Sequence, residues 1–139
     1  LNANWDTARA KDIVDAWIQK HGDKIEFIFS NNDSMALGAL QSVQSLGYNQ
    51  GDNGKFIPIV GVDAIPDMLN EIKKGTIVGT VLNDALNQAK AVVDLSLNVA
   101  NGKEPLEGTQ YTLDDVKAVR VPYVPITLDN IQVAEDTYK

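Results

Sequence analysis

Several classes of protein are excluded by what this sequence lacks. Its 139 residues include no cysteine, which excludes a disulfide framework, a thiol nucleophile and Cys-ligated zinc. The single histidine, His21, argues against His-based catalysis. No apolar run approaches the roughly 18 residues of a membrane helix. Basic residues are also few, 12 against 19 acidic ones, which argues against nucleic acid as a partner because phosphate binding needs a basic patch.

Sequence motifs of common enzymes are missing as well. There is no glycine-rich phosphate loop, no nucleophile-elbow motif and no paired-histidine metal motif, which disfavours an enzyme. The formal net charge of -7 fits a neutral or cationic ligand better than an anionic one. We therefore expect a binding protein without covalent chemistry.

What the sequence does contain is a repeated order of apolar strands and amphipathic helices. A helix is predicted at residues 6–22, and three strand-helix units follow it, with strands at 25–29, 57–62 and 76–82 and helices at 33–47, 66–75 and 84–102. Strands that are apolar on both faces and alternate with helices predict an α/β fold, a parallel sheet with helices on both faces. Residues 119–126 favour an extended crossing segment with two prolines, and 128–138 a short terminal helix.

Polar residues follow the three predicted strands. In open parallel sheets ligands bind just outside the carboxyl ends of the strands, where Asn32, Asp63 and Asn83 lie. Each has an alternative role as a helix cap, but neighbouring residues offer the same caps, namely Asn31, Asp33 and Asp84. Carboxylate and amide groups suit the vicinal hydroxyls of a sugar, so we expect this edge of the sheet to bind a neutral polyol.

The two tryptophans have different sequence surroundings. Trp17 stands among the apolar positions of the first helix and is expected in the core. Trp5 precedes that helix between Asn4 and Asp6, where its indole could cover the C–H face of a pyranose or, alternatively, seal an edge of the core. Glu26 is the other unusual residue, because a carboxylate just inside a buried strand needs a cation, a hydrogen-bond donor or a metal.

Five motifs in order carry a resemblance to a known family. The motifs are WDTARAKDIVDAW, KIEFIFSNNDSMALGAL, PIVGVDAIPDML, GTIVGTVLNDALNQAK and VRVPYV. The chain resembles the periplasmic glucose/galactose-binding proteins of sugar ABC transport, which have the type 1 periplasmic binding protein fold. The resemblance implies hexose contacts at Trp5, Asn32, Asp63 and Asn83. It also implies an extracytoplasmic protein, periplasmic or anchored as a lipoprotein, that delivers the hexose to an ABC transporter permease, with a chemoreceptor as a further possible partner.

The resemblance covers only the second half of the family's chain, so we expect a truncated fragment with an incomplete fold and part of the site. By resemblance, residues 1–83 belong to the C-terminal lobe, 84–117 to the N-terminal lobe, and 118–139 to the hinge crossing and the end of the C-terminal lobe. The family's calcium site combines a loop missing here with one distant Glu, which falls on Glu26. Exposed sheet edges predict self-association of the fragment as a dimer, which light scattering would test.

A rival interpretation shares the fold and the position of the site. The effector-binding domain of a LacI-type transcriptional repressor would bind its ligand at the same edge of the sheet. The gene sequence before Leu1 discriminates the two, because a repressor requires a helix-turn-helix there and an exported protein requires a signal.

Overall fold

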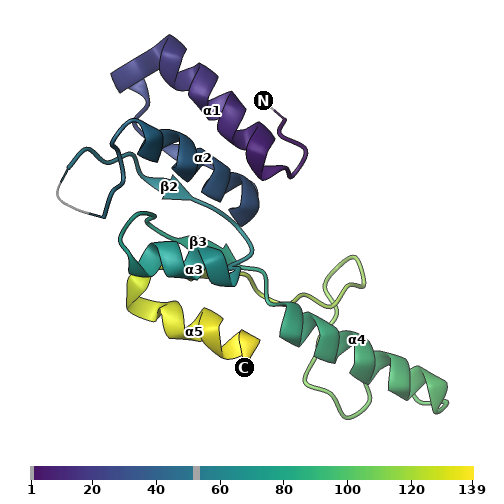
Figure 1. The fold of residues 1–139 in the computed structure, drawn as a ribbon. Helices are drawn as coiled ribbons and strands as arrows, with labels where there is room; N and C mark the ends of the chain where they lie inside the picture. Colours follow the sequence, from purple (N-terminus) through teal and green to yellow (C-terminus); the bar gives the residue numbers. More distant parts are fainter. Residues whose placement is uncertain (1, 52–53) are drawn as a thin grey trace. The chain divides into compact units, whose positions relative to one another are not determined.

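Helices alternate with short strands along the chain, whose computed structural model describes residues 2–51 and 54–139 (Figure 1). The helices are α1 (Thr7–His21), α2 (Asp33–Ser45), α3 (Pro66–Lys73), α4 (Ala85–Ala100) and α5 (Ile131–Glu135), with 3-10 turns η1 (Gly22–Lys24), η2 (Leu128–Asn130) and η3 (Asp136–Tyr138). The strands are β1 (Ile28–Phe29), β2 (Ile59–Val60), β3 (Thr80–Leu82) and β4 (Val124–Ile126). The predicted order of elements is confirmed, and the strands are shorter than the apolar runs.

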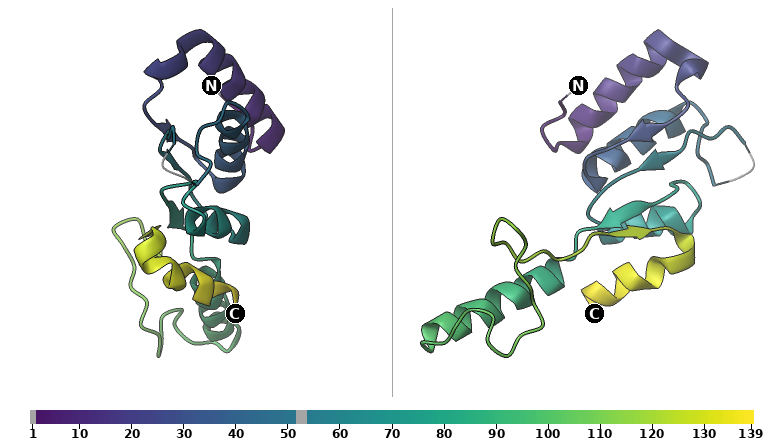
Figure 2. Two further views of the ribbon diagram at one scale, coloured as in Figure 1. Left: turned by 60° about the vertical axis from the view of Figure 1, so that its left-hand side comes forward. Right: turned by 180° about the vertical axis from the view of Figure 1, so that it is seen from behind.

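Helix α1 begins and ends where the sequence predicts. The Asp6 carboxylate accepts a hydrogen bond from the Arg9 backbone N–H at 2.7 Å, and Gly22 ends the helix with a φ of 53°. Both views of Figure 2 show α1 lying alongside α2. Gly38 permits this contact, because a Cβ atom there would lie 2.2 Å from the Thr7 carbonyl oxygen.

The sheet is parallel from β1 to β3 and turns antiparallel at β4. Ile28 pairs with Ile59 between β1 and β2, and parallel bridges join Val60 to Gly79 and Asp63 to Leu82. Strand β4 runs antiparallel to β3, with Pro125 opposite Val81. The α/β class with a parallel sheet is thus confirmed, and the extended segment with prolines is an added antiparallel strand.

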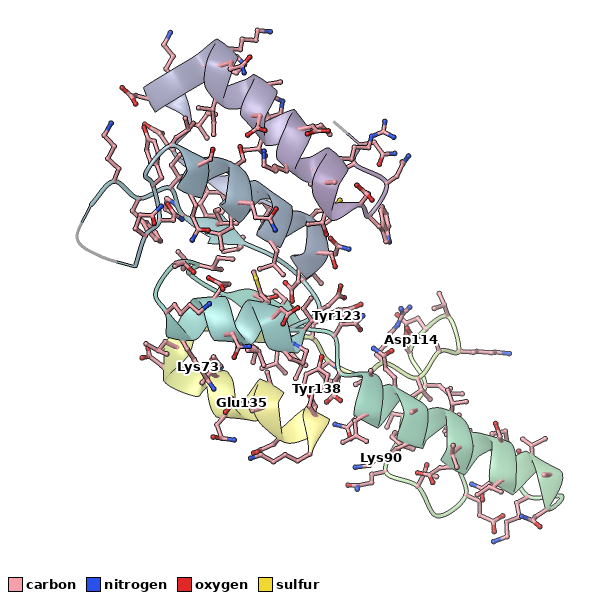
Figure 3. The ribbon with its side chains drawn as sticks, viewed as in Figure 1. Lys73, Lys90, Asp114, Tyr123, Glu135 and Tyr138 are labelled. Atoms are coloured by element: carbon pink, nitrogen blue, oxygen red, sulfur yellow. The ribbon has the colours of Figure 1, made fainter. Side chains whose placement is uncertain are left out.

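One apolar core joins the strands to the helices beside them. Helix α2 packs against β1 and β2, and α5 packs against β4 and α3. The largest fully buried apolar side chains are Val43, Ile59, Met68, Ile72, Leu82 and Ile126. Lys73 of α3 and Glu135 of α5, both labelled in Figure 3, form an ion pair between these two helices. The terminal segment is helical as predicted, as η2, α5 and η3 in succession.

The chain divides into two compact units. The first runs to Asn83 and resumes at Val124, and the second is Asp84–Tyr123. In the second unit, Asp84 caps α4 by accepting from the Asn87 backbone N–H at 2.9 Å, and the Tyr111 hydroxyl donates to Asp94 at 3.2 Å. Among the described helices none has the length and apolar character needed to cross a bilayer. The assignment of the units to particular lobes stays a prediction.

Candidate ligand-binding site

The backbone brings the carboxyl ends of the three parallel strands to one edge of the first unit. The Asp33 N–H donates to the Val62 carbonyl oxygen at 2.8 Å, and the Asp63 N–H donates to the Val81 carbonyl oxygen at 2.8 Å. These bonds continue the sheet ladder past the strand ends. As a result, Asn32, Asp63 and Asn83 lie on adjacent segments, which is the arrangement expected of a ligand site in a parallel sheet.

Asp63 and Asn83 are brought into direct contact. The Asn83 side-chain amide donates to Asp63 Oδ1 at 3.3 Å, and both residues are half-buried. Asp63 has a φ of 119°, and the next residue, Ala64, has a φ of 62°. Neither is a glycine, so the backbone here occupies conformations that L-residues seldom adopt and that cluster at ligand sites. The pair offers carboxylate acceptors beside an amide, a combination suited to adjacent hydroxyls.

Asn32 lies at the same edge with part of its side chain already used. Its Oδ1 accepts from the Met35 backbone N–H at 2.9 Å and so caps α2, while its backbone carbonyl accepts from the Ser30 hydroxyl at 2.8 Å. The expectation that a neighbour would cap this helix is therefore wrong for α2, whereas Asp84 does cap α4. The amide NH₂ of Asn32 is the group left to donate to a ligand.

Asp33 is a functional candidate that the sequence alone does not reveal, because an aspartate at the start of a helix is accounted for as a possible cap. Its side chain is fully buried, with Oδ1 accepting from the Thr80 hydroxyl at 2.6 Å and Oδ2 accepting from the Ile65 backbone N–H at 2.9 Å. Burial raises the pKa of this carboxyl to about 6, although these two hydrogen bonds act in the opposite direction. The sequence signal is a glycine inside a predicted strand, Gly61, which indicates close approach of another group. In the structure a Cβ atom there would lie 2.3 Å from Asp33 Oδ1.

Trp5 lies in the turn before α1 with its indole in solvent. Its side chain is 70% exposed and its φ is 64°, so it does not seal an edge of the core. The close contact of Thr7 with Gly38 places this turn beside the first half of α2, the helix that Asn32 caps. Trp17, in contrast, packs against the core as predicted. A sugar-stacking role for Trp5 stays a prediction.

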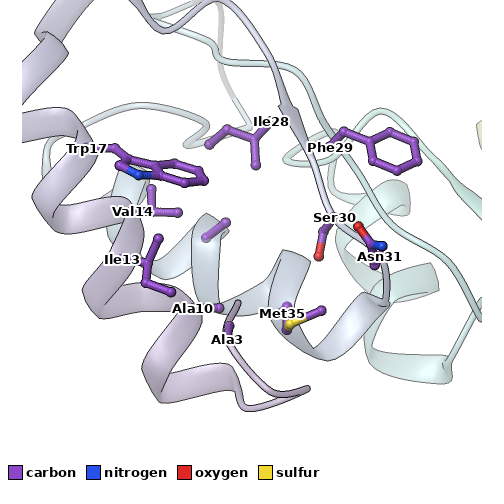
Figure 4. Close-up of a pocket in the computed structure, with 11 residues that line it drawn as sticks. Ala3, Ala10, Ile13, Val14, Trp17, Ile28, Phe29, Ser30, Asn31 and Met35 are labelled. Atoms are coloured by element: carbon purple, nitrogen blue, oxygen red, sulfur yellow. The ribbon is translucent and has the colours of Figure 1, made fainter. Parts of the chain in front are cut away.

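An apolar pocket in the first unit lies beside Asn32, since its lining includes Asn31 and Met35. Figure 4 shows it between α1, β1 and the start of α2, with the indole of Trp17 on one side. Its lining is mainly aliphatic and aromatic, and it does not include Trp5, Asn32, Asp63 or Asn83. Its polar lining residues are Ser30 and Asn31, fewer polar groups than the several hydroxyls of a polyol call for.

Glu26 is exposed, which overturns the premise that its carboxylate is buried in a strand. Strand β1 begins two residues later, at Ile28, so Glu26 is solvated and needs no partner. Within residues 2–51 and 54–139, no three His, Cys, Asp or Glu side chains come together as a metal site. Calcium takes about six to eight oxygen ligands, so the described residues alone do not fit the ion, and a role for Glu26 in a calcium site stays a prediction.

Comparison with known proteins places this geometry in a family context. Residues 1–104 match a family model described as periplasmic binding protein domain. The chain is 52% identical, over 91% of its length, to a D-galactose/methyl-galactoside binding periplasmic protein of Haemophilus influenzae, and 35% identical, over 95%, to a xylitol-binding protein of Mycolicibacterium smegmatis. It spans about a third of each relative, 36% and 33%.

Comparison with solved structures also finds a similar fold in a binding protein. An ABC transporter solute binding protein of Bacillus halodurans, with bound myo-inositol, superposes with a TM-score of 0.76 at 29% identity. The match covers 98% of this chain and 42% of that protein.

Proposed function

The chain belongs to the periplasmic binding protein family, and on that premise we propose that it supplies sugar-contacting residues to a protein that binds a hexose, D-galactose or D-glucose, without covalent chemistry. The observation that carries the proposal is the Asp63–Asn83 pair, held beside Asn32 at the carboxyl ends of the strands. The 52% identity to a galactose-binding protein supports a hexose as the ligand.

In the proposed complex, polar side chains bind the sugar hydroxyls and an aromatic side chain covers the apolar face of the ring. Asp63 accepts hydrogen bonds from ring hydroxyls, and the amides of Asn32 and Asn83 add donors. Trp5 covers the C–H face of the ring, since its indole is large, rigid and 70% exposed before a ligand arrives. None of these groups is arranged as a nucleophile with a base, which is consistent with capture and release of an unchanged sugar.

Partners and location follow from the same premise. We propose that the complete protein works outside the cytoplasm and hands the hexose to an ABC transporter permease. Interaction with a chemoreceptor and anchoring as a lipoprotein are finer proposals from the family resemblance, and self-association of the isolated fragment as a dimer is a proposal from its exposed sheet edges. The repressor alternative finds no support in the three relatives reported above, each of which is named as a binding protein.

The two tryptophans provide a matched test. In the complete gene product, Trp5→Ala is expected to weaken D-galactose binding about tenfold or more, because truncating an aromatic anchor is costly, with little change in the unfolding temperature. Trp17→Phe changes a tryptophan that packs against the core and is not one of the proposed contacts; it is expected to lower the unfolding temperature while leaving affinity unchanged. Titration calorimetry and thermal unfolding measure both; equal affinities for Trp5→Ala and wild type would contradict the stacking role.

A further inference from the structure

One buried carboxylate connects the segments that carry the proposed sugar contacts. Asp33 follows Asn32 directly in the chain, and its two oxygens reach Thr80 of β3 at 2.6 Å and the Ile65 backbone N–H, two residues beyond Asp63, at 2.9 Å. Thr80 itself lies three residues before Asn83 and is buried. A single side chain, on the segment that follows β1, therefore links the turn after β2 to the first residue of β3.

The backbone around Asp63 needs such a support. Asp63 and Ala64 both have positive φ, at 119° and 62°, a strained conformation that persists only where surrounding contacts over-determine it. Ala64 is fully buried, and the next residue, Ile65, gives its N–H to Asp33. The absence of a side chain at Gly61 makes room for the carboxylate, since a Cβ atom there would lie 2.3 Å from Asp33 Oδ1.

We propose that Asp33 is a positioning residue for the sugar site: it touches no ligand, and it ties the Asp63 turn to β3 in the geometry that presents Asp63 and Asn83 together. This inference rests on the proposed function. It extends that function by assigning part of the ligand affinity to a residue with no access to solvent.

The opposite end of the strands offers a matched control. Asn49 is 1% exposed, and its side chain donates to the carbonyl oxygens of Ile57 at 2.8 Å and Thr76 at 2.9 Å and accepts from the Ile57 N–H at 2.8 Å. Asn49 thus joins the segments leading into β2 and β3, whereas Asp33 joins the turn after β2 to β3 itself. Asn49→Ala removes a buried polar link of similar extent that lies away from the proposed site.

The experiment compares Asp33→Ala, Asp33→Asn and Asn49→Ala in the complete gene product. Titration calorimetry with D-galactose measures affinity, and hydrogen-deuterium exchange measures protection of the amides at residues 63–65. Asp33→Ala is expected to weaken binding by about tenfold or more, because the hydrogen bonds that tie the turn at Ile65 to Thr80 of β3 are lost, and to speed exchange at the turn. Asp33→Asn keeps an acceptor for Ile65 and offers a donor to Thr80, so it is expected to restore both readouts.

Asn49→Ala is expected to lower the unfolding temperature without changing galactose affinity or the exchange of residues 63–65. The proposal is overturned if Asp33→Ala leaves affinity and local exchange unchanged, or if Asn49→Ala weakens binding as much as Asp33→Ala does. If the wild-type protein binds no galactose, the proposed function fails by itself, and the exchange data still decide whether Asp33 holds the turn.

Discussion

Asp33 and Asp63 lie in opposite environments although each follows a strand of the same sheet. Asp63 is half-buried and meets the amide of Asn83, whereas Asp33 is fully enclosed between α2, β3 and the turn after β2. Transferring a carboxylate out of water penalises its charged form. The same residue type can therefore serve as a ligand contact at one position and as an internal support at the other.

The raised pKa of Asp33 predicts a definite dependence of stability on pH. Its folded pKa of about 6 lies above the ordinary value of 3.8, so between these values the folded state holds a proton that the unfolded state has released. As pH rises from 4 to 6, this group lowers the free energy of unfolding by roughly 2 kcal/mol. The titratable groups facing it are the Asp63 carboxyl and, from η3, the Tyr138 hydroxyl, which is neutral in this pH range.

Urea denaturation of wild type and Asp33→Asn at several pH values between 4 and 7 isolates this contribution. The side chain introduced by Asp33→Asn does not titrate, so the free energy of unfolding of this variant relative to wild type is expected to increase as pH rises through this range. Other carboxyls titrate alike in both proteins and cancel in the difference. A difference that does not vary with pH would show that Asp33 does not titrate in this way.

The roles of Asn32 and Asp33 mark the limit of prediction at single residues. Both types are good helix caps, so local sequence favours neither at the start of α2. The choice is made by Thr80 and Ile65, which lie far along the chain and reach the carboxylate in the folded state. The three polar strand ends, in contrast, were predictable because apolar runs locate the strands and parallel strands end at one edge.

At the scale of elements, the contact of α1 with α2 depends on Gly38. A Cβ atom there would lie 2.2 Å from the Thr7 carbonyl oxygen and 3.2 Å from the Lys11 backbone nitrogen, and backbone atoms cannot move aside cheaply. Gly38→Ala is therefore expected to destabilise the protein by about 1–3 kcal/mol through overpacking, although alanine favours a helix. Chemical denaturation measures the change, with the exposed Gln41→Ala in the same helix as a near-neutral control. Increased stability of Gly38→Ala would contradict the close packing.

The helices were easier to predict than the strands. Asp6, Pro66 and Asp84 introduce α1, α3 and α4 through local chemistry that a sequence displays. The strands β1 and β2 pair over only two residues each, since pairing requires a partner in register and an apolar run alone does not supply one. The antiparallel direction of β4 was not predictable, because it depends on the path by which the chain returns.

At the scale of the whole molecule, the chain supplies one side of a proposed sugar site within a longer family architecture. It spans about a third of the curated relatives it matches, and its net charge of -7 suits an uncharged sugar better than a phosphorylated one. Phe27 precedes β1 and Phe29 lies on it, and their side chains are 52% and 66% exposed. Exposed apolar side chains favour contact with another chain, so self-association of the isolated chain stays a prediction.

The central claim is that Asp63, held beside Asn83 at the strand ends, accepts the hydroxyls of a bound hexose. Titration calorimetry of the complete gene product with D-galactose, D-glucose and D-ribose, for wild type and Asp63→Ala, tests it most directly. We predict one-to-one binding of galactose or glucose by wild type, weaker binding of ribose, and loss of hexose binding in a folded Asp63→Ala variant, whose site lacks its acceptor. Hexose binding of equal affinity in wild type and Asp63→Ala, or no hexose binding at all, would contradict the account.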